Sequence, residues 1–166
     1  MCGIHDIVNI ENTIGVFHEI DMEKMVEQVF TGKVNTRKLS IPVYEKTSEA
    51  LTKGVYSGYG KNIGATAYGS PDYETLASMR ENVYIFSGAK NYQCTREMEQ
   101  KLKEINNALV KKNEIVKFEA FKKEAKKIFG TYNETYLLVE YNTAIAQAKA
   151  AANWRSEEHT SELQSR

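Results

Sequence analysis

The sequence predicts a mainly α-helical fold, with five to six helices in an irregular bundle behind an irregular N-terminal arm. Apolar residues recur three and four positions apart over most of the chain, which is the spacing of one helix face. The 166 residues include only 2 prolines and 10 glycines, too few for the many tight turns of an all-β protein. Hydrophobic residues make up 42% of the chain, so a packed core is expected.

The first half of the chain is expected to hold two helices after the arm. Residues 1–20 show no sustained period and form the predicted arm. Asp21 can cap the helix that follows, and Gly32 can end it. The next helix is expected near Pro42, a favourable first-turn residue, and to be broken by residues 57–64. The apolar face of the first helix is Met22, Met25, Val26, Val29 and Phe30.

Ser70 and Pro71 mark a clear helix start. Serine is a favoured cap, proline a favoured first helical residue, and acidic residues in the first turn suit the helix dipole. Helical spacing then continues as far as residue 111. The segment is predicted to be either one long bent helix or two helices broken near Gly88–Asn91.

The last part of the chain is expected to form two further helices. A turn at Lys112–Asn113 precedes the first, and Gly130 is expected to end it in a left-handed conformation. Asn133 is expected to cap the last helix. Small residues are frequent from Ala144 to Ala152, which permits a close approach between helices.

The C-terminal residues 155–166 resemble the translation of a short-read sequencing adapter. We therefore expect the natural reading frame to run off the end of a fragment near Trp154, and the tail carries no expectation about the fold. Removing its two arginines and three glutamates changes the formal net charge from 0 to +1. The expected organisation is an arm at 1–20, a helical domain at 21–154 and an artefact at 155–166.

Composition excludes several classes of protein. Lys plus Arg and Asp plus Glu are both 22, so the chain is not a strongly basic nucleic-acid binder of the histone kind. The two cysteines, Cys2 and Cys94, cannot build a disulfide framework. No run approaches 18 apolar residues, so no membrane span is expected.

Few residues point to catalysis, and we expect no enzyme, cofactor or metal. Met1–Ile4 resembles the start of amidotransferases that use an N-terminal cysteine, which makes Cys2 a remote alternative nucleophile. Nothing after residue 5 fits that family. The glycine-rich run 58–64 follows a helix and is interpreted as a connector, not a phosphate cradle. Cys94 is predicted to be a small buried hydrophobic residue.

Lysines gather in the second half of the chain. They could neutralise phosphates, which makes a DNA-binding structural protein the first alternative, but glutamates interleave with them. A solvated helix face is the favoured interpretation. The nucleic-acid candidates are Lys111, Lys112, Lys117, Lys122, Lys123, Lys126 and Lys127.

Three segments together resemble phage head morphogenesis proteins of the Mu F-like type, the minor head proteins encoded beside the portal. The resemblance runs from about Phe30 to Trp154, and its best parts are Tyr44–Thr47 with Leu51–Gly60, Leu76–Lys90 and the closing run Tyr136–Trp154. The last is the most characteristic, since family members carry a similar Glu-Tyr-Asn-Thr-Ala run leading through small residues to a tryptophan. The motifs are helical packing patterns and not reaction chemistry.

The resemblance implies a structural role in capsid assembly at the portal vertex. The implied partners are the portal and other phage head proteins, with DNA as a further possibility and no membrane. The implied locations are the host cytoplasm during assembly and then the virion. It also implies that the chain is the N-terminal part of a longer protein. The protein-interface candidates are Tyr84, Phe86, Tyr141, Ala144, Ala148, Ala152 and Trp154.

Overall fold

The computed structural model describes residues 22–112 and 114–165, and the predicted arm and Cys2 lie outside this range. About 82% of the structure is helical, which confirms the mainly α class. Within the described residues there is no strand, only an isolated bridge between Asn35 and Lys38. The elements in chain order are α2 (Met22–Phe30), α3 (Ile41–Tyr59), η2 (Ile63–Ala65), α4 (Pro71–Val110), α5 (Phe118–Thr131), η3 (Tyr132–Leu137) and α6 (Leu138–Gln164).

The helix count is slightly lower than predicted. Helices α5 and α6 are joined without a break by η3, a π-helical turn of six residues. Counted as continuous segments, the described residues therefore contain four helices, where the sequence pattern predicts five to six.

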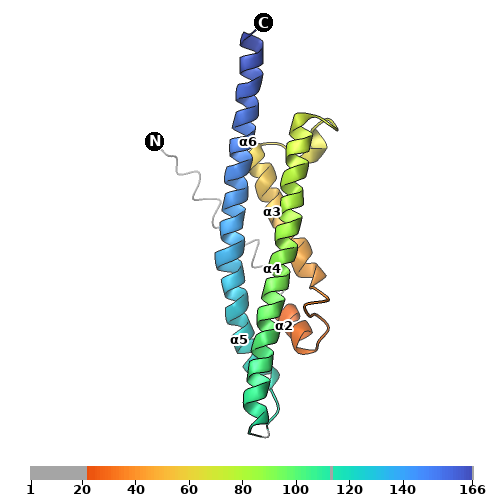
Figure 1. Ribbon diagram of the computed structural model, residues 1–166, viewed down its shortest axis with the longest axis vertical. Coiled ribbons are helices and arrows are strands. Elements are labelled where there is room, and N and C mark those ends of the chain that lie inside the picture. Colours follow the sequence, from red (N-terminus) through yellow and green to blue (C-terminus); the bar gives the residue numbers. More distant parts are fainter. Residues whose placement is uncertain (1–21, 113, 166) are drawn as a thin grey trace, which may run out of the picture. The chain divides into compact units, whose positions relative to one another are not determined.

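Helix α4 is one uninterrupted helix of 40 residues, so the single-helix alternative is correct (Figure 1). It begins as predicted at Pro71, and the Ser70 hydroxyl accepts a hydrogen bond from the Tyr73 amide at 3.2 Å. Gly88 does not break it, because a glycine inside a helix costs only about 1 kcal/mol relative to alanine. Neighbouring turns with strong helix formers outweigh that cost.

The predicted boundary between the last two helices is wrong. Gly130 lies inside α5 and does not adopt a positive φ angle. Asn133 lies in the π turn, and its side-chain oxygen Oδ1 has no hydrogen-bond partner, so it does not cap a helix. The extra residue of a π turn keeps the chain helical while rotating the faces that follow it.

Helix α3 runs further than predicted. Ser57 and Gly58 belong to it, and the chain leaves the helix only at Gly60, whose φ angle is +82°. Gly58 suits this position because α6 approaches it closely. A Cβ atom at residue 58 would lie 2.4 Å from the Ile145 carbonyl oxygen and 3.0 Å from the Ala148 Cβ.

The chain divides into two compact units, each built from separate stretches of sequence. Among the described residues, unit 1 comprises residues 22–47, 87–112 and 114–138, and unit 2 comprises residues 48–86 and 139–165. Helices α3 and α4 each contribute one part to each unit.

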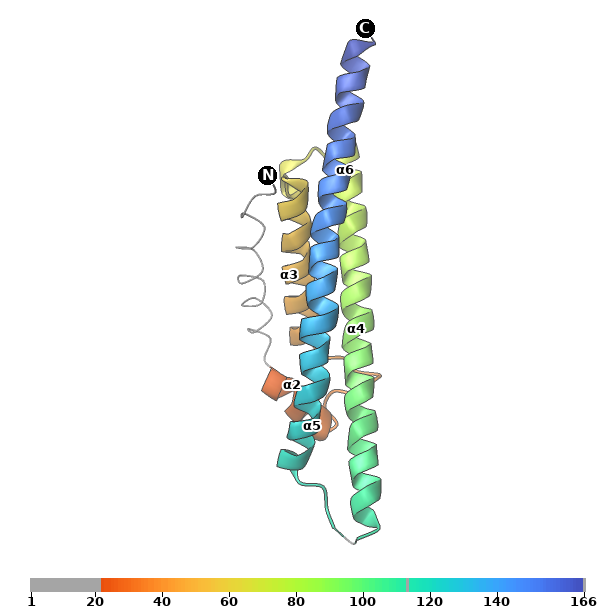
Figure 2. The ribbon, with the colours of Figure 1, turned by 90° about the vertical axis from the view of Figure 1, so that its left-hand side faces the viewer.

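The core of unit 1 forms where α2 packs on α5, two helices that lie side by side in both views (Figures 1 and 2). Met25, Phe121 and Phe129 are at most 1% exposed. The Phe30 ring meets the Phe118 ring edge-on at 5.3 Å. This face is the one that the spacing of Met25, Val26 and Val29 predicts.

The core of unit 2 combines parts of α3, α4 and α6. Leu51, Leu76 and Ala148 are fully buried, and Ala144 is 7% exposed. Helix α6 continues to Gln164, so the adapter-like residues 155–164 prolong it without a structural boundary at Trp154.

Candidate functional site

The small residues predicted for an interface are partly used inside the chain. Ala144 and Ala148 are buried in unit 2, where α6 faces the glycines of α3. They are therefore unavailable to a partner while unit 2 is folded. Ala152 is half-buried one turn further along α6.

The aromatic interface candidates differ in exposure. Tyr84 is 38% exposed and Trp154 is 64% exposed, whereas Phe86 and Tyr141 are half-buried. The ring of Tyr141 lies against Gly54, within 2.8 Å of where a Cβ atom at residue 54 would stand. The indole nitrogen of Trp154 donates to the Glu158 carboxylate at 3.0 Å, and Glu158 belongs to the adapter-like tail. Tyr84 is thus the exposed aromatic candidate whose surroundings depend least on that tail.

Tyr84 belongs to a small surface patch with Arg80 and Ile85, which we call the Tyr84 patch. Arg80 Nη2 donates to the Tyr84 hydroxyl at 2.7 Å, and this bond raises the pKa of the guanidinium. The guanidinium carbon also lies 5.6 Å from the centre of the Tyr84 ring. Ile85 is 64% exposed beside them. Sequence reasoning missed Ile85 and Arg80, although their place beside Tyr84 on one helix could have indicated both.

Part of the lysine cluster is neutralised by glutamates of unit 1. Lys122 and Lys126 both pair with Glu23 of α2, at 3.0 and 3.8 Å, and Lys127 pairs with Glu124 at 2.9 Å. The Lys122 pair raises the pKa of that lysine, and the Lys127 pair lowers the pKa of Glu124. On this face two glutamates therefore offset most, but not all, of the charge of three lysines.

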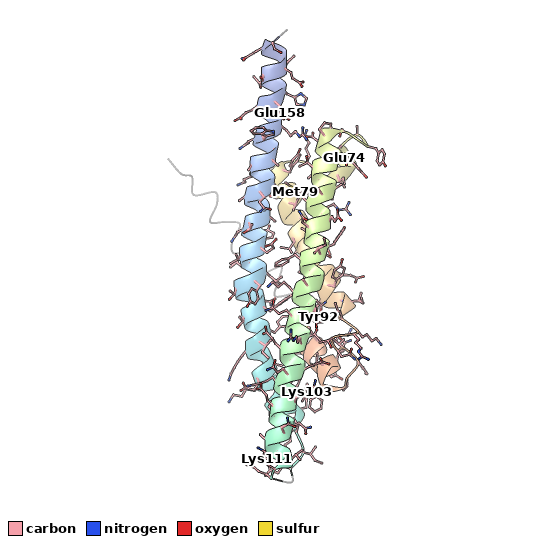
Figure 3. All side chains as sticks on the ribbon, viewed as in Figure 1. Glu74, Met79, Tyr92, Lys103, Lys111 and Glu158 are labelled. Atoms are coloured by element: carbon pink, nitrogen blue, oxygen red, sulfur yellow. The ribbon has the colours of Figure 1, made fainter. Side chains whose placement is uncertain are left out.

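The remaining lysine candidates are exposed and lack such pairs in the described part of the chain. Lys111 and Lys112 directly follow the end of α4, and Figure 3 labels Lys111 there. Lys117 directly precedes α5, and Lys123 lies in its second turn. Lys103, also labelled in Figure 3, helps to line a groove of about 310 Å³ along α4. The groove residues are Thr36, Tyr92, Arg96, Glu99, Gln100 and Lys103. Its single carboxylate between basic groups gives it a mixed charge.

A polar cluster that the sequence did not indicate centres on Asp72 in unit 2. Its carboxylate accepts hydrogen bonds from the Tyr59 hydroxyl and from Lys61 Nζ, both at 2.7 Å. The lysine bond and then the tyrosine bond hold the pKa of Asp72 below its usual value. Burial, followed by the hydrogen bond to Asp72, raises the pKa of Tyr59 to about 12. The cluster ties the end of α3 to the start of α4.

Cys94 is buried, as predicted, at 2% exposure. Burial raises the pKa of its thiol to about 12, with a smaller contribution from the Glu97 charge. A thiol held in its protonated form is a poor nucleophile at neutral pH.

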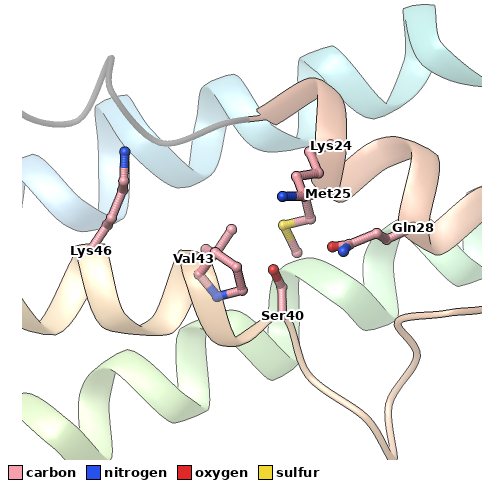
Figure 4. A pocket seen from close by; sticks show the side chains of 7 residues that line it. Lys24, Met25, Gln28, Ser40, Val43 and Lys46 are labelled. Atoms are coloured by element: carbon pink, nitrogen blue, oxygen red, sulfur yellow. The ribbon is translucent and has the colours of Figure 1, made fainter.

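A small cavity lies between α2 and the start of α3 (Figure 4). Its volume is about 30 Å³, roughly the share of one water molecule in the liquid. This is far below the about 300 Å³ or more of a small-molecule site. It is lined by Lys24, Met25, Gln28, Ser40, Pro42, Val43 and Lys46.

Within residues 22–112 and 114–165, no group of three or more His, Cys, Asp or Glu side chains is placed to hold a metal ion. Nor does that part of the chain contain a helix with the length and apolar character needed to cross a bilayer. Comparisons of the chain with protein-family models, curated proteins and solved structures found no match.

Proposed function

We propose that the chain is a structural protein of a tailed-phage head that works through protein–protein contacts. The observation that carries this proposal is the Tyr84 patch, which lies within Leu76–Lys90, a segment that resembles phage head morphogenesis proteins. The proposed partners are the portal and other head proteins, in the host cytoplasm during assembly and then in the virion.

The chemistry of the Tyr84 patch suits a protein partner. Tyrosine and arginine are enriched at the residues that contribute most to protein interfaces. The hydrogen bond from Arg80 holds the Tyr84 ring in place before binding, which reduces the entropy lost on association. Ile85 adds a large exposed side chain whose burial contributes about 1.5–3 kcal/mol.

The test is co-purification with the portal protein, whose gene is expected beside this one. The wild-type chain is expected to co-purify, and Ile85→Asp is expected to abolish or strongly weaken the complex. Ile115→Asp is the matched control, because Ile115 is 87% exposed and lies in unit 1, whereas Ile85 lies in unit 2. Circular dichroism checks that both variants are folded.

Two results would contradict the proposal. One is that the wild-type chain binds no head protein from its own gene cluster. The other is that Ile85→Asp and Ile115→Asp bind equally well, which would remove the Tyr84 patch from the interface. The neighbouring genes give an independent check, since a terminase and a portal gene are expected immediately upstream.

DNA binding is the second candidate function, and the exposed lysines without glutamate partners favour it. Lys111, Lys112, Lys117 and Lys123 are the residues concerned. If they contact phosphates, changing each one to glutamine should reduce the salt dependence of duplex binding by about 0.9 in log–log slope. Lys122→Gln is the control, since that lysine already pairs with Glu23. A wild-type chain that elutes from DNA at low salt would exclude this function.

A further inference from the structure

Unit 1 contains a row of polar side chains in its interior. Ser87, Asn91 and Thr95 occupy successive turns of one face of α4, and each is 0% exposed. Thr47 of α3 is also 0% exposed, and Tyr132 of the π turn is 2% exposed. In each of the five residues, a buried side-chain oxygen has no hydrogen-bond partner from the protein.

Exposed threonines of the same chain behave differently. The hydroxyls of Thr75, Thr131 and Thr143 each donate to the backbone carbonyl four residues earlier, at 2.8, 3.1 and 2.8 Å. This local bond is available to a threonine in almost any helix. Thr47 and Thr95 do not form this bond to the backbone. Their hydroxyls instead lie in the interior without a protein partner.

The π turn directs a further hydroxyl into unit 1. Tyr132 is its first residue, and burial raises the pKa of the phenol while the neighbouring Thr47 hydroxyl offsets part of the rise. The two hydroxyls are thus neighbours that interact with each other, but neither makes a well-formed hydrogen bond to a protein atom. Cys94 also lies close enough to influence Tyr132.

Asn91 is satisfied on one side only. Its amide Nδ2 donates to the Ser40 carbonyl at 2.7 Å, which fixes the amide plane between the start of α3 and α4. This leaves Oδ1 as a buried acceptor that requires a donor. Hydroxyl groups can both donate and accept hydrogen bonds, so the row contains hydrogen-bond donors as well as acceptors.

We propose that these five side chains form an internal water-binding site in unit 1. Leaving a buried donor or acceptor unpaired costs about 1–3 kcal/mol, and five such groups would be hard to reconcile with a stable unit. Water fits because it can both donate and accept and binds where two to four polar groups converge. A metal cation fits less well, because all five ligands are neutral and none would offset the cost of burying its charge.

The first measurement is water–protein magnetisation transfer by NMR on the wild-type chain. Cross-peaks from long-lived water to the methyl groups of Thr47 and Thr95 are expected. Their absence would overturn the proposal, whatever the stability of the variants.

The second measurement compares Thr95→Val with Thr131→Val by chemical denaturation. Valine matches threonine in shape and replaces only the hydroxyl with a methyl group. The difference between the two variants therefore reports the effect of burying the hydroxyl. If water bridges Thr95, the unfolding equilibrium constant of Thr95→Val should exceed that of the control about tenfold, which corresponds to about 1.4 kcal/mol. If Thr95→Val were as stable as Thr131→Val or more stable, the Thr95 hydroxyl would have no water partner. That result would overturn the proposal.

A second pair of variants keeps the test valid if Thr95→Val does not fold. Ser87→Ala removes a buried hydroxyl of the row, and Ser78→Ala removes an exposed one from the same helix. Both substitutions gain the same helix propensity. The unfolding equilibrium constant of Ser87→Ala should therefore exceed that of Ser78→Ala by a similar factor. The reverse order would overturn the proposal.

Discussion

Gly58→Ala should destabilise the protein, although alanine is the better helix former. Gly58 lies inside α3, where a change to alanine would normally gain about 1 kcal/mol. The new Cβ atom, however, would stand 2.4 Å from the Ile145 carbonyl oxygen and 3.0 Å from the Ile145 Cα atom. Both obstacles are backbone atoms, so relief requires α3 and α6 to move apart.

The size of the effect follows from two opposing contributions. Overpacking a close contact costs about 1–3 kcal/mol, and a clash with backbone belongs in the upper half of that range. After subtracting the gain in helix propensity, we expect the free energy of unfolding to fall by about 1–2 kcal/mol. For a chain of this length, that lowers the Tm by about 2–8 °C.

Differential scanning calorimetry of Gly58→Ala and Gly88→Ala provides the assay. Gly88 is the matched control, because it is also inside a helix, but its nearest obstacle is a Tyr44 ring carbon at 3.9 Å. Gly88→Ala should raise the Tm by about 2–4 °C. If Gly58→Ala raised the Tm as well, the close contact between α3 and α6 would be refuted.

The remaining predictions concern charge, thiol reactivity and the core. Asp72→Asn should lower the Tm at pH 7. Because the pKa of Asp72 is lower in the folded state, its contribution is fully present above the unfolded value near 3.8, and the difference should vanish as the pH falls from there through the lower folded-state pKa. Absorbance titration should show the Tyr59 phenol ionising near pH 12, and a value near 10 would contradict its bond to Asp72. In a Cys2→Ser background, Cys94 should react with a thiol reagent at pH 8 only after denaturation, and rapid native reaction would contradict its burial. Phe121→Ala should cost about 3–5 kcal/mol by denaturant titration, because the ring is fully buried between α2 and α5, and a cost below 1 kcal/mol would contradict that packing.

Local signals predicted the start of α4 and the buried face of α2. The Ser70–Pro71 pair defines the beginning of α4, and the spacing of Met25, Val26 and Val29 identifies the buried face of α2. These patterns depend on residues within one or two helical turns, so they can be recognised without knowing the fold of the remaining chain. The burial of Cys94 was expected because it lies on a predicted helix with no second cysteine and no histidine nearby.

Features that depend on distant partners were predicted poorly. Gly58 looked like part of a connector, but its lack of a side chain serves the approach of α6, which lies more than 80 residues later in the chain. Gly130 and Asn133 looked like stop and cap residues, but the π turn carries the helix past both. The burial of Asn91 could not be anticipated, because its partner is a carbonyl 51 residues away.

The candidate surfaces were predicted in part. Tyr84 is exposed, as an interface residue must be, but Arg80 and Ile85 beside it were overlooked. The lysine cluster was interpreted as one group, whereas Glu23 pairs with two of its members. Glu23 lies almost 100 residues earlier in the chain, and no local pattern relates it to α5.

The pairing of α2 with α5 has a consequence for synthesis of the protein. Unit 1 is assembled from one stretch that ends at residue 47 and another that begins at residue 87, with residues 48–86 of unit 2 inserted between them. During translation, Met25 leaves the ribosome long before Phe121 exists to cover it. At about 5–20 residues per second, this interval lasts roughly 5–20 s. The nascent chain must therefore keep the apolar face of α2 from aggregating until α5 emerges, which makes a slow translation rate a hazard and chaperone binding to α2 a benefit.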